Sequence, residues 1–223
     1  MLSKDIKQLV TQTYRRLAEY QKAGKSVFVT SSFQTHSIPL LHIVSLADTT
    51  VPVYFLDTGF HFPETLEYRD QIAELLDIEV IPLKSPITKF NQRDANGRFL
   101  FCSNADYCCH INKVLPLEPV LAEKDVWITG VRRDQNANRK KMDYESAGPF
   151  STLRYHPMLD WTSKMIWEYR KEYNLPEHPL EKEGYLSVGC EPCTQKYLED
   201  DGRSGRWAGQ RKDECGLHTE LIK

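Results

Sequence analysis

The stretch KSVFVTSSFQTHSIPLLHIV, residues 25–44, decides the fold that this sequence predicts. It begins with an apolar run rich in β-branched residues, which indicates a buried strand. Ser and Thr follow at once and indicate a polar turn at the end of that strand. An apolar helix comes next, and Pro39 fits its first turn because no intrahelical N–H bond is lost there. A strand, a polar turn and a helix in this order are typical of one unit of an α/β protein.

The same alternation of strands and helices continues on both sides of this stretch. Apolar residues three or four apart over 3–22 predict an amphipathic first helix, and Pro63 opens another helical pattern. Further apolar runs that predict buried strands lie at 51–59, 78–83, 125–135 and 153–159. Such nearly continuous apolar strands, alternating with helices, predict an α/β fold: a parallel twisted sheet of about five strands with helices on both faces.

The composition is that of an ordinary folded protein. The chain has 223 residues, of which 40% are hydrophobic and 27% charged, and its formal net charge is -2. This charge gives no overall attraction to nucleic acid or to an anionic membrane. The N-terminal residues lack the apolar segment of a signal peptide, and no apolar run approaches the length of a membrane span. We therefore expect a cytoplasmic protein of enzyme size.

The C-terminal end of the sequence differs from the rest. From about Leu198 onward the apolar periodicity stops, and glycines recur at 202, 205, 209 and 216. We therefore expect one nucleotide-binding α/β domain over residues 1–197 and a flexible tail over residues 198–223.

Three loops follow predicted strands and are rich in Ser, Thr, Gly, Asp and Arg: residues 30–37, 56–65 and 129–139. In a parallel sheet a ligand binds beyond the carboxyl ends of the strands, at the point where the strand order reverses. Each loop alone has an ordinary structural explanation. Together the three loops predict a site for the anionic part of a nucleotide.

The first two loops carry hydroxyl, carboxylate and glycine groups that suit such a site. Ser32 and Ser37 would bind phosphate or sulfate together with the N-terminal N–H groups of the next helix, or would simply cap that helix. Asp57 can accept a hydrogen bond from a ribose or base, and Gly59 permits close approach of the backbone. A helix started by Pro63 is the alternative explanation, and it leaves the Asp-Thr-Gly sequence unexplained.

The third loop carries arginines. Arg132, Arg133 and Arg139 come just after a predicted strand, where guanidinium groups would bind phosphate or sulfate oxygens in bidentate pairs. An ordinary solvated face is the alternative. The sequence has no Gly-x-x-x-x-Gly-Lys-Ser/Thr motif, which excludes a P-loop of the Walker type.

Four of the six cysteines form two close pairs that are far apart in the sequence: Cys108 with Cys109, and Cys190 with Cys193. This pattern is typical of a metal site that joins two segments of a chain. Neighbouring side chains on a helix diverge by about 100°, which suits the separate irons of a cluster better than one ion. The spacing therefore favours a 4Fe-4S cluster over zinc, with buried free thiols as the structural alternative. Cys102 belongs to neither pair and is expected to be a packed thiol.

Two further residues near these motifs suggest chemistry. Lys113 lies one helical turn after Cys109, so it is expected to face the same way and would meet an anionic ligand, unless it is simply solvated. Cys215 lies among charged residues in the predicted tail, where packing cannot explain it. Because the thiolate is a nucleophile, we expect Cys215 to react with a substrate and then with a second protein.

The sequence resembles the adenylyl-sulfate / phosphoadenylyl-sulfate reductase family over nearly its whole length after residue 25. The resemblance is carried by SSFQTHS (31–37), FLDTGFHFPET (55–65), YCCHINKVLPL (107–117), WITGVRRDQNANR (127–139), HPMLDWT (156–162), GYLSVGCEPCT (184–194), GRSGRWAG (202–209) and ECGLH (214–218). It implies the fold of the adenine-nucleotide α-hydrolases, with a modified pyrophosphate loop.

The resemblance also implies roles for individual residues. It implies that Cys108, Cys109, Cys190 and Cys193 hold a 4Fe-4S cluster and that Cys215 is the nucleophile. It implies that Ser32 to Ser37, with Phe33 and Gln34 between them, hold the phosphate or sulfate region of the nucleotide. The positions that match substrate-contacting positions of the family are Lys113, Arg132 or Arg133, Arg203, Arg206 and His218. Asp57, Thr58 and Gly59 are expected to bind substrate on the chemistry of their loop. Phe33 and Gln34 replace the glycines usual in a pyrophosphate loop, which fits a reductase rather than an ATP-cleaving relative.

The activity that the resemblance implies is reduction of adenylyl sulfate to sulfite and AMP in assimilatory sulfate reduction. The expected course is attack by Cys215, formation of an S-sulfocysteine and release of sulfite by a thioredoxin-type partner. A phosphoadenylyl-sulfate reductase or an enzyme of dual specificity is the alternative. An ATP pyrophosphatase and a zinc-stapled nucleotide-binding module without catalysis are the rivals from other classes. A homo-oligomer is compatible with the sequence.

Overall fold

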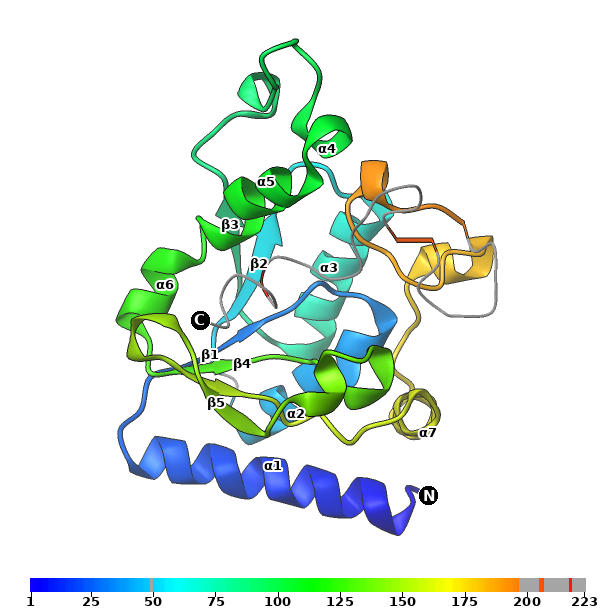
Figure 1. Ribbon diagram of the computed structural model, residues 1–223. Coiled ribbons are helices and arrows are strands. Elements are labelled where there is room, and N and C mark those ends of the chain that lie inside the picture. Colours follow the sequence, from blue (N-terminus) through cyan, green and yellow to red (C-terminus); the bar gives the residue numbers. More distant parts are fainter. Residues whose placement is uncertain (49, 197–204, 207–216, 218–223) are drawn as a thin grey trace.

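The computed structural model describes residues 1–48, 50–196, 205, 206 and 217, and it contains one mixed sheet of six strands (Figure 1). The strand order is β3-β2-β1-β4-β6-β5. The strands are β1 (Val27–Thr30), β2 (Val53–Asp57), β3 (Val80–Lys84), β4 (Val126–Ile128), β5 (Glu145–Ala147) and β6 (Leu153–Tyr155). Strand β5 runs antiparallel to β6, and the other neighbours are parallel.

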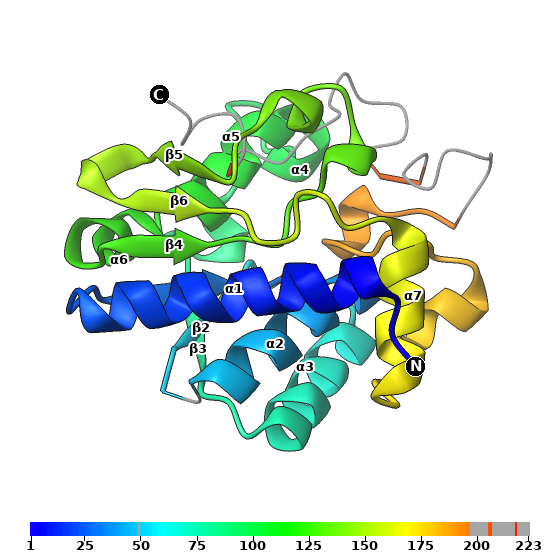
Figure 2. The ribbon, with the colours of Figure 1, turned by 90° about the horizontal axis from the view of Figure 1, so that it is seen from below.

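Helices cover both faces of this sheet. The helices are α1 (Lys4–Lys22), α2 (Ile38–Ala47), α3 (Pro63–Leu76), α4 (Leu100–Ser103), α5 (Ala105–Cys109), α6 (Glu118–Glu123) and α7 (Ser163–Glu172). Successive side chains of a strand point to opposite faces, so Val29 packs in the larger core with α1, α2, α3 and α7. Its neighbour Phe28 packs in a smaller core on the other face with Trp127 and α6. Figure 2 shows α1 beside α2 on the side of the larger core.

The predicted α/β fold is confirmed, and its helix starts follow the prolines. Pro39 lies in the first turn of α2, and Pro63 is the first residue of α3. Proline is tolerated there because the first N–H groups of a helix have no intrahelical partner. The five apolar runs of the sequence are the five mutually parallel strands. Strand β5 was not predicted, because its residues Glu-Ser-Ala contain no apolar run.

Strand β1 lies between β2 and β4. The chain continues from β1 to β2 and β3 on one side and then returns to β4 on the other side of β1, so the strand order reverses at β1. This reversal of strand order is the point at which open α/β sheets bind ligands. The segment between β3 and β4 contains α4, α5, a π-helical turn (His110–Val114) and α6. It rises over the carboxyl ends of β2 and β3 (Figure 1) and carries the first cysteine pair.

Among the described residues, no helix has the length and apolar character needed to cross a membrane.

Of the predicted tail, residues 198–223, only Gly205, Arg206 and Leu217 belong to the described part of the chain, so the proposed division into domain and tail stays a prediction.

Candidate functional site

A cleft of about 290 Å³ opens at the carboxyl ends of β1 and β4. Its lining comes from the loop after β1, the loop after β4, the N-terminal end of α7 and the segment that leads to Cys190. The residues that line it and were named from the sequence are Ser32, Gln34, Ser37, Lys113, Arg132, Arg139, Cys190 and Arg206. The cleft is therefore at the predicted position and holds hydroxyl and cationic groups.

The loop after β1 contains a residue other than glycine with a positive φ. Phe33 has a φ of 51°, in the left-handed region that glycine favours. Its side chain is fully buried against Phe55, and this packing offsets the backbone strain. Phe33 is fully buried and is not among the residues that line the cleft, so its predicted contact with substrate stays a prediction. Its N–H donates to Ser31 Oγ at 3.1 Å.

The hydroxyls of this loop face one another at the start of α2. Ser32 Oγ and Ser37 Oγ are 3.4 Å apart, and Gln34 Nε2 donates to Ser32 Oγ at 3.2 Å. Ser37 is the residue before α2, yet its side chain makes no capping hydrogen bond. The capping explanation of these serines therefore does not account for Ser37, and both hydroxyls line the cleft.

Two histidines that the sequence reasoning missed also line the cleft. Burial by surrounding atoms, with Arg132 nearby, lowers the pKa of His36 to about 4. Burial likewise lowers the pKa of His61 to about 4, and its Nε2 lies 2.9 Å from the carbonyl oxygen of Leu56. Both rings are neutral at neutral pH and would offer a hydrogen bond rather than a charge. In the sequence, the only sign that these histidines belong to the site is that each lies on one of the predicted loops.

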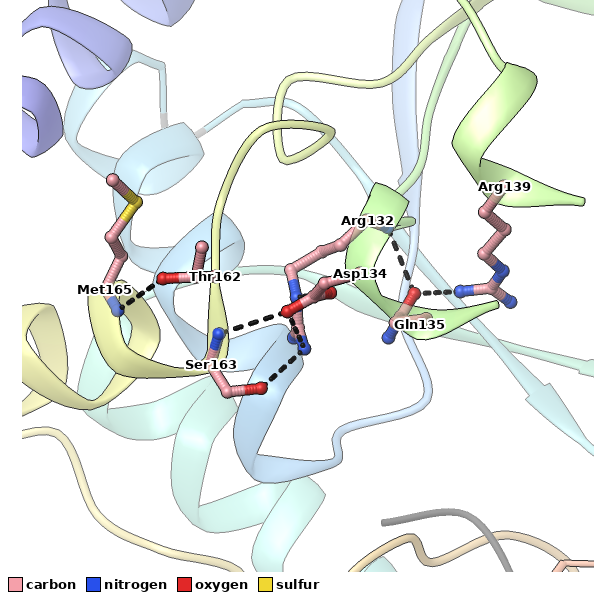
Figure 3. A network of polar contacts seen from close by, with 7 residues as sticks. All are labelled: Arg132, Asp134, Gln135, Arg139, Thr162, Ser163 and Met165. Atoms are coloured by element: carbon pink, nitrogen blue, oxygen red, sulfur yellow. Dashed lines mark hydrogen bonds and ion pairs between the residues drawn. The ribbon is translucent and has the colours of Figure 1, made fainter. Parts of the chain in front are cut away.

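Arg132 and Arg133 are adjacent in sequence but have different surroundings. Arg132 is 3% exposed and lines the cleft, with Nε donating to Asp134 Oδ1 at 2.9 Å and Nη2 to Ser163 Oγ at 3.1 Å (Figure 3). Arg133 pairs with Asp160 and donates to the carbonyl of Met142, and it does not line the cleft. Of the two arginines, the structure thus brings only Arg132 to the candidate site.

A polar network holds the loop after β4 in place, as Figure 3 shows. Asp134 also accepts the backbone N–H of Ser163, the first residue of α7, at 3.2 Å. Gln135 Oε1 accepts from the backbone N–H of Arg132 at 3.0 Å and from the guanidinium of Arg139. The side chains of Asp134 and Gln135 therefore fix both arginines at the cleft, a role that no sequence motif indicated.

Asp57, Thr58 and Gly59, at the end of β2 and in the turn after it, are not among the residues that line the cleft. Asp57 accepts the N–H of Gly59 at 3.0 Å and pairs with Lys84 at 3.5 Å, and Gly59 has a φ of 71°. Thr58 is buried, and its hydroxyl lies 3.3 Å from the sulfur of Cys190. Asp57 and Gly59 thus shape a turn while Thr58 faces a cysteine, and substrate contact by these three residues stays a prediction.

The two cysteine pairs meet around one small cavity of about 20 Å³. Cys108 and Cys109 come from α5, whereas Cys190 precedes a short 3-10 turn (Glu191–Cys193) and Cys193 is its last residue. Burial, with the neighbouring thiols of Cys190 and Cys193, raises the pKa of Cys108 to about 11. The five described cysteines form no disulfide, and Cys102 is exposed and outside this cavity. The prediction that Cys102 is a packed thiol is therefore wrong, because α4 packs through Leu100 and Phe101 and leaves Cys102 exposed.

The side chains around this cavity are suitable ligands for a group that is bound through sulfur. Four thiols surround it, and Asn112 Nδ2 lies 3.6 Å from the Cys108 sulfur, as a donor to a thiolate would. Within the described ranges, no three His, Cys, Asp or Glu side chains are placed to hold a metal ion. The arrangement brings four thiols to one cavity but does not show that they bind a metal.

Lys113 and Arg206 line both the cleft and the cysteine cavity. Lys113 lies on the π-helical turn, a feature often found at functional sites. Arg206 lies directly over Gly189, where an added Cβ would be 2.3 Å from its guanidinium atoms. Strand-like pairing of Thr194 with Arg206, and a 2.8 Å hydrogen bond from Gln195 N–H to the Gly205 carbonyl, hold this part of the chain. Two cations thus lie between the two cavities.

Three of the residues named from the sequence, Arg203, Cys215 and His218, lie outside the described residues. Leu217, which the sequence reasoning passed over, is described. It is 8% exposed and lines the cleft.

Comparison with known proteins agrees with this architecture. The chain is 37% identical over 204 residues to adenosine 5'-phosphosulfate reductase of Bacillus cereus (strain Q1), covering 90% of this chain and 87% of that protein. It is 42% identical over 190 residues to the protein of the same name from Chelativorans sp. (strain BNC1), covering 84% and 77%.

Among solved structures, the fold is similar to phosphoadenylyl-sulfate reductase from Candida auris, with a TM-score of 0.65 and 20% identity over 86% of this chain and 97% of that chain. It is also similar to the U34-tRNA thiolase NcsA from Methanococcus maripaludis, solved with its [4Fe-4S] cluster, with a TM-score of 0.55 and 12% identity over 78% of this chain and 67% of that chain.

The family described as phosphoadenosine phosphosulfate reductase domain matches residues 26–196, which contain both cavities apart from Arg206 and Leu217. The chain belongs to this family.

Proposed function

We propose that this protein reduces adenylyl sulfate to sulfite and AMP, with Cys215 as nucleophile and a thioredoxin-type dithiol as reductant. The observation that carries the proposal is the position of Lys113 and Arg206, which line both the nucleotide-sized cleft and the four-cysteine cavity. A phosphosulfate group carries two negative charges, and fixed cations offset the cost of removing them from water. The names of the relatives from Bacillus cereus and Chelativorans support the same substrate.

The nucleotide would bind at the end of the sheet where strand order reverses. Hydroxyls of Ser32 and Ser37 and the guanidinium of Arg132 line the cleft as donors to phosphate or ribose oxygens. The neutral ring of His36 adds a hydrogen-bonding group without adding charge. Charge on the sulfuryl end would then face Lys113 and Arg206, and Arg203 and His218 are proposed as further contacts from the C-terminal segment.

In the first step the Cys215 thiolate attacks the sulfur of the sulfuryl group. A bond forms between the two sulfur atoms, the bond from sulfur to the bridging oxygen breaks, and AMP leaves with that electron pair. The product is an S-sulfocysteine. Lys113 and Arg206 would stabilise the charge that develops on the sulfuryl and phosphate oxygens, which is the largest catalytic contribution we invoke.

In the second step a thiolate of the dithiol partner attacks the Cys215 sulfur and sulfite leaves. The second thiol of the partner then displaces Cys215 from the mixed disulfide, so the partner supplies the two electrons and ends as a disulfide. This exchange requires a thiolate and a reducing partner, for which the cytoplasm is the compartment we propose.

We propose that Cys108, Cys109, Cys190 and Cys193 hold a 4Fe-4S cluster, supported by the shared cavity of their side chains. When bound, the cluster would supply a fixed charge next to the anion site and would join α5 to the Cys190 segment. Asn112 and Thr58 would orient the sulfur ligands, because each lies within reach of one cysteine sulfur.

The test measures sulfite release by anaerobically purified protein with thioredoxin, from adenylyl sulfate and from its 3′-phosphorylated form. We expect higher kcat/KM for adenylyl sulfate, and comparable values would instead support dual specificity. Cys215→Ser should abolish turnover while nucleotide binding stays unchanged, and Cys102→Ser is the matched control that should keep activity. Turnover by Cys215→Ser would refute the proposed nucleophile.

A further inference from the structure

Leu217 is a buried apolar residue within a polar part of the sequence. It follows Lys212, Asp213, Glu214, Cys215 and Gly216, yet only 8% of its surface is exposed. It packs into the smaller core, on the face of the sheet that α6 covers, in a cluster with Phe28 of β1 and Trp127 of β4. The apolar contacts of this one side chain therefore join the C-terminal end of the chain to the sheet.

Leu217 belongs to an apolar cluster, here called the socket, whose members come from β1, β2, β4, the π-helical turn and α6. Phe28, Leu56 and Trp127 come from β1, β2 and β4, and Val114 comes from the π-helical turn that also carries Lys113. Burying a leucine removes apolar surface from water, which opposes the entropy cost of holding a short segment in place. The socket thus gives a physical reason for the chain to stay at this position.

Leu217 also belongs to the lining of the cleft, together with Ser32, Lys113 and Arg132. Residue 215 is two positions away along the chain, and two residues span at most about 7 Å even when fully extended. A chain that is fixed at Leu217 therefore keeps Cys215 within reach of the cleft by covalent geometry alone.

We propose that Leu217 is a positioning residue: its side chain anchors the C-terminal segment to the sheet and so holds Cys215 at the sulfuryl end of the bound nucleotide. This proposal rests on the proposed role of Cys215 as nucleophile. Leu217 touches no reacting atom in this scheme. It acts through Cys215, by limiting how far the thiolate is from the sulfur that it attacks.

The experiment compares Leu217→Ala with Leu217→Met, which keeps an apolar side chain of similar volume. The first measurement is the rate at which iodoacetamide alkylates Cys215, read by mass spectrometry on the tryptic peptide 213–223. We expect faster alkylation in Leu217→Ala and a rate near that of the wild type in Leu217→Met. Equal alkylation in all three proteins would overturn the anchor, and this result does not depend on whether Cys215 is catalytic.

The second measurement is a single turnover with adenylyl sulfate and no reductant, followed by the sulfite mass added to the same peptide. We expect Leu217→Ala to form the adduct at least about tenfold more slowly, since misplacing a reacting group costs this much or more. The circular dichroism spectrum should be unchanged, and the reaction is run at saturating adenylyl sulfate so that any weaker nucleotide binding does not affect the rate. Faster alkylation with an unchanged adduct rate would overturn the positioning role.

The two proposals fail in distinguishable ways. If Cys215→Ser still releases sulfite, the proposed nucleophile is wrong, and the positioning role is overturned with it whatever the alkylation rates. If Cys215→Ser is inactive but Leu217→Ala behaves as the wild type in both measurements, the nucleophile stands and only the anchor is wrong.

Discussion

The guanidinium of Arg132 is paired with the carboxylate of Asp134, with Nε 2.9 Å from Oδ1, and the pair lies at the edge of the cleft. The third nitrogen, Nη1 of Arg132, is buried and has no hydrogen-bond partner among the described residues. A buried donor without a partner is costly, so a ligand that accepts its hydrogen bond is favoured. Asp134 thus orients an arginine that lines the cleft, and we propose that the remaining donor of this arginine binds the nucleotide.

Replacing Asp134 by Asn tests this relationship. The substitution keeps the shape of the side chain but removes the charge that holds Arg132, so we expect KM for the nucleotide to rise about tenfold, or roughly 1.4 kcal/mol. The expected change in kcat is smaller, because the contact proposed for Arg132 is with the nucleotide and not with the sulfur. Steady-state kinetics with adenylyl sulfate give both values.

Asp160→Asn is the matched control for Asp134→Asn. It removes the partner of Arg133, which lies outside the cleft lining, so nucleotide KM should stay within about twofold of the wild type because exposed ion pairs contribute little. An equal rise in KM for both variants would contradict the distinction between the two arginines.

Gly189→Ala should displace Arg206 without unfolding the protein. The new Cβ would lie 2.3 Å from the guanidinium atoms, which are the flexible end of a side chain and can move. Because Arg206 is one of two cations between the cavities, we expect kcat/KM to fall about a hundredfold. Steady-state kinetics and a thermal melt measure the two effects.

A double-mutant cycle separates this effect from others. In an Arg206→Ala background, Gly189→Ala should cause no further loss of kcat/KM, because the group that it displaces is already absent. Additive losses would show that Gly189 acts by another route, such as the nearby Cys190 turn.

The cysteine cavity predicts the iron content of the purified protein. Anaerobic purification should give about four irons and four sulfides per chain, as expected for four thiolate ligands. Cys190→Ser and Cys193→Ser should lose most of this iron, whereas Cys102→Ser, which alters an exposed side chain outside the cavity, should retain it. Iron and sulfide analysis measures this, and stoichiometric zinc without sulfide would refute the cluster.

The lowered pKa values of two buried histidines predict how the free energy of unfolding depends on pH. Burial lowers the pKa of His156 to about 3 and of His178 to about 4, and both rings accept or share hydrogen bonds with buried threonines. The unfolded chain, with a histidine pKa near 6.5, binds more protons below that pH than the folded chain does. The free energy of unfolding should therefore fall as pH drops from about 6.5 towards 4, by roughly 1 to 2 kcal/mol per histidine at pH 5.

Urea denaturation at pH 7, 6 and 5 measures this slope. His178→Asn should flatten part of it, because asparagine does not take up a proton on unfolding. A slope unchanged by His178→Asn would show that this ring is already protonated in the folded protein.

The sequence by itself predicted most of the architecture. An apolar run such as Val27 to Val29 must be buried whatever surrounds it, and Pro39 and Pro63 can start a helix but not continue one. These are local constraints, and they led to the five parallel strands, to the helices on both faces and to the position of the cleft. Strand β5 escaped prediction because its three residues contain no apolar run and it forms only by pairing with β6.

Only the tertiary structure decided which side chains meet. Arg132 and Arg133 are equivalent in the sequence, and the packing of the loop against α7 directs one to the cleft and the other to Asp160. In the sequence, Leu217 lies in a polar segment near the C-terminus. Only its packing in the smaller core, on the α6 face, shows that it is buried. Cys108 and Cys190 are separated by more than eighty residues, and chain folding brings both to one cavity. Burial and periodicity act over a few residues and are written in the sequence, whereas contacts between distant segments depend on how the whole chain packs.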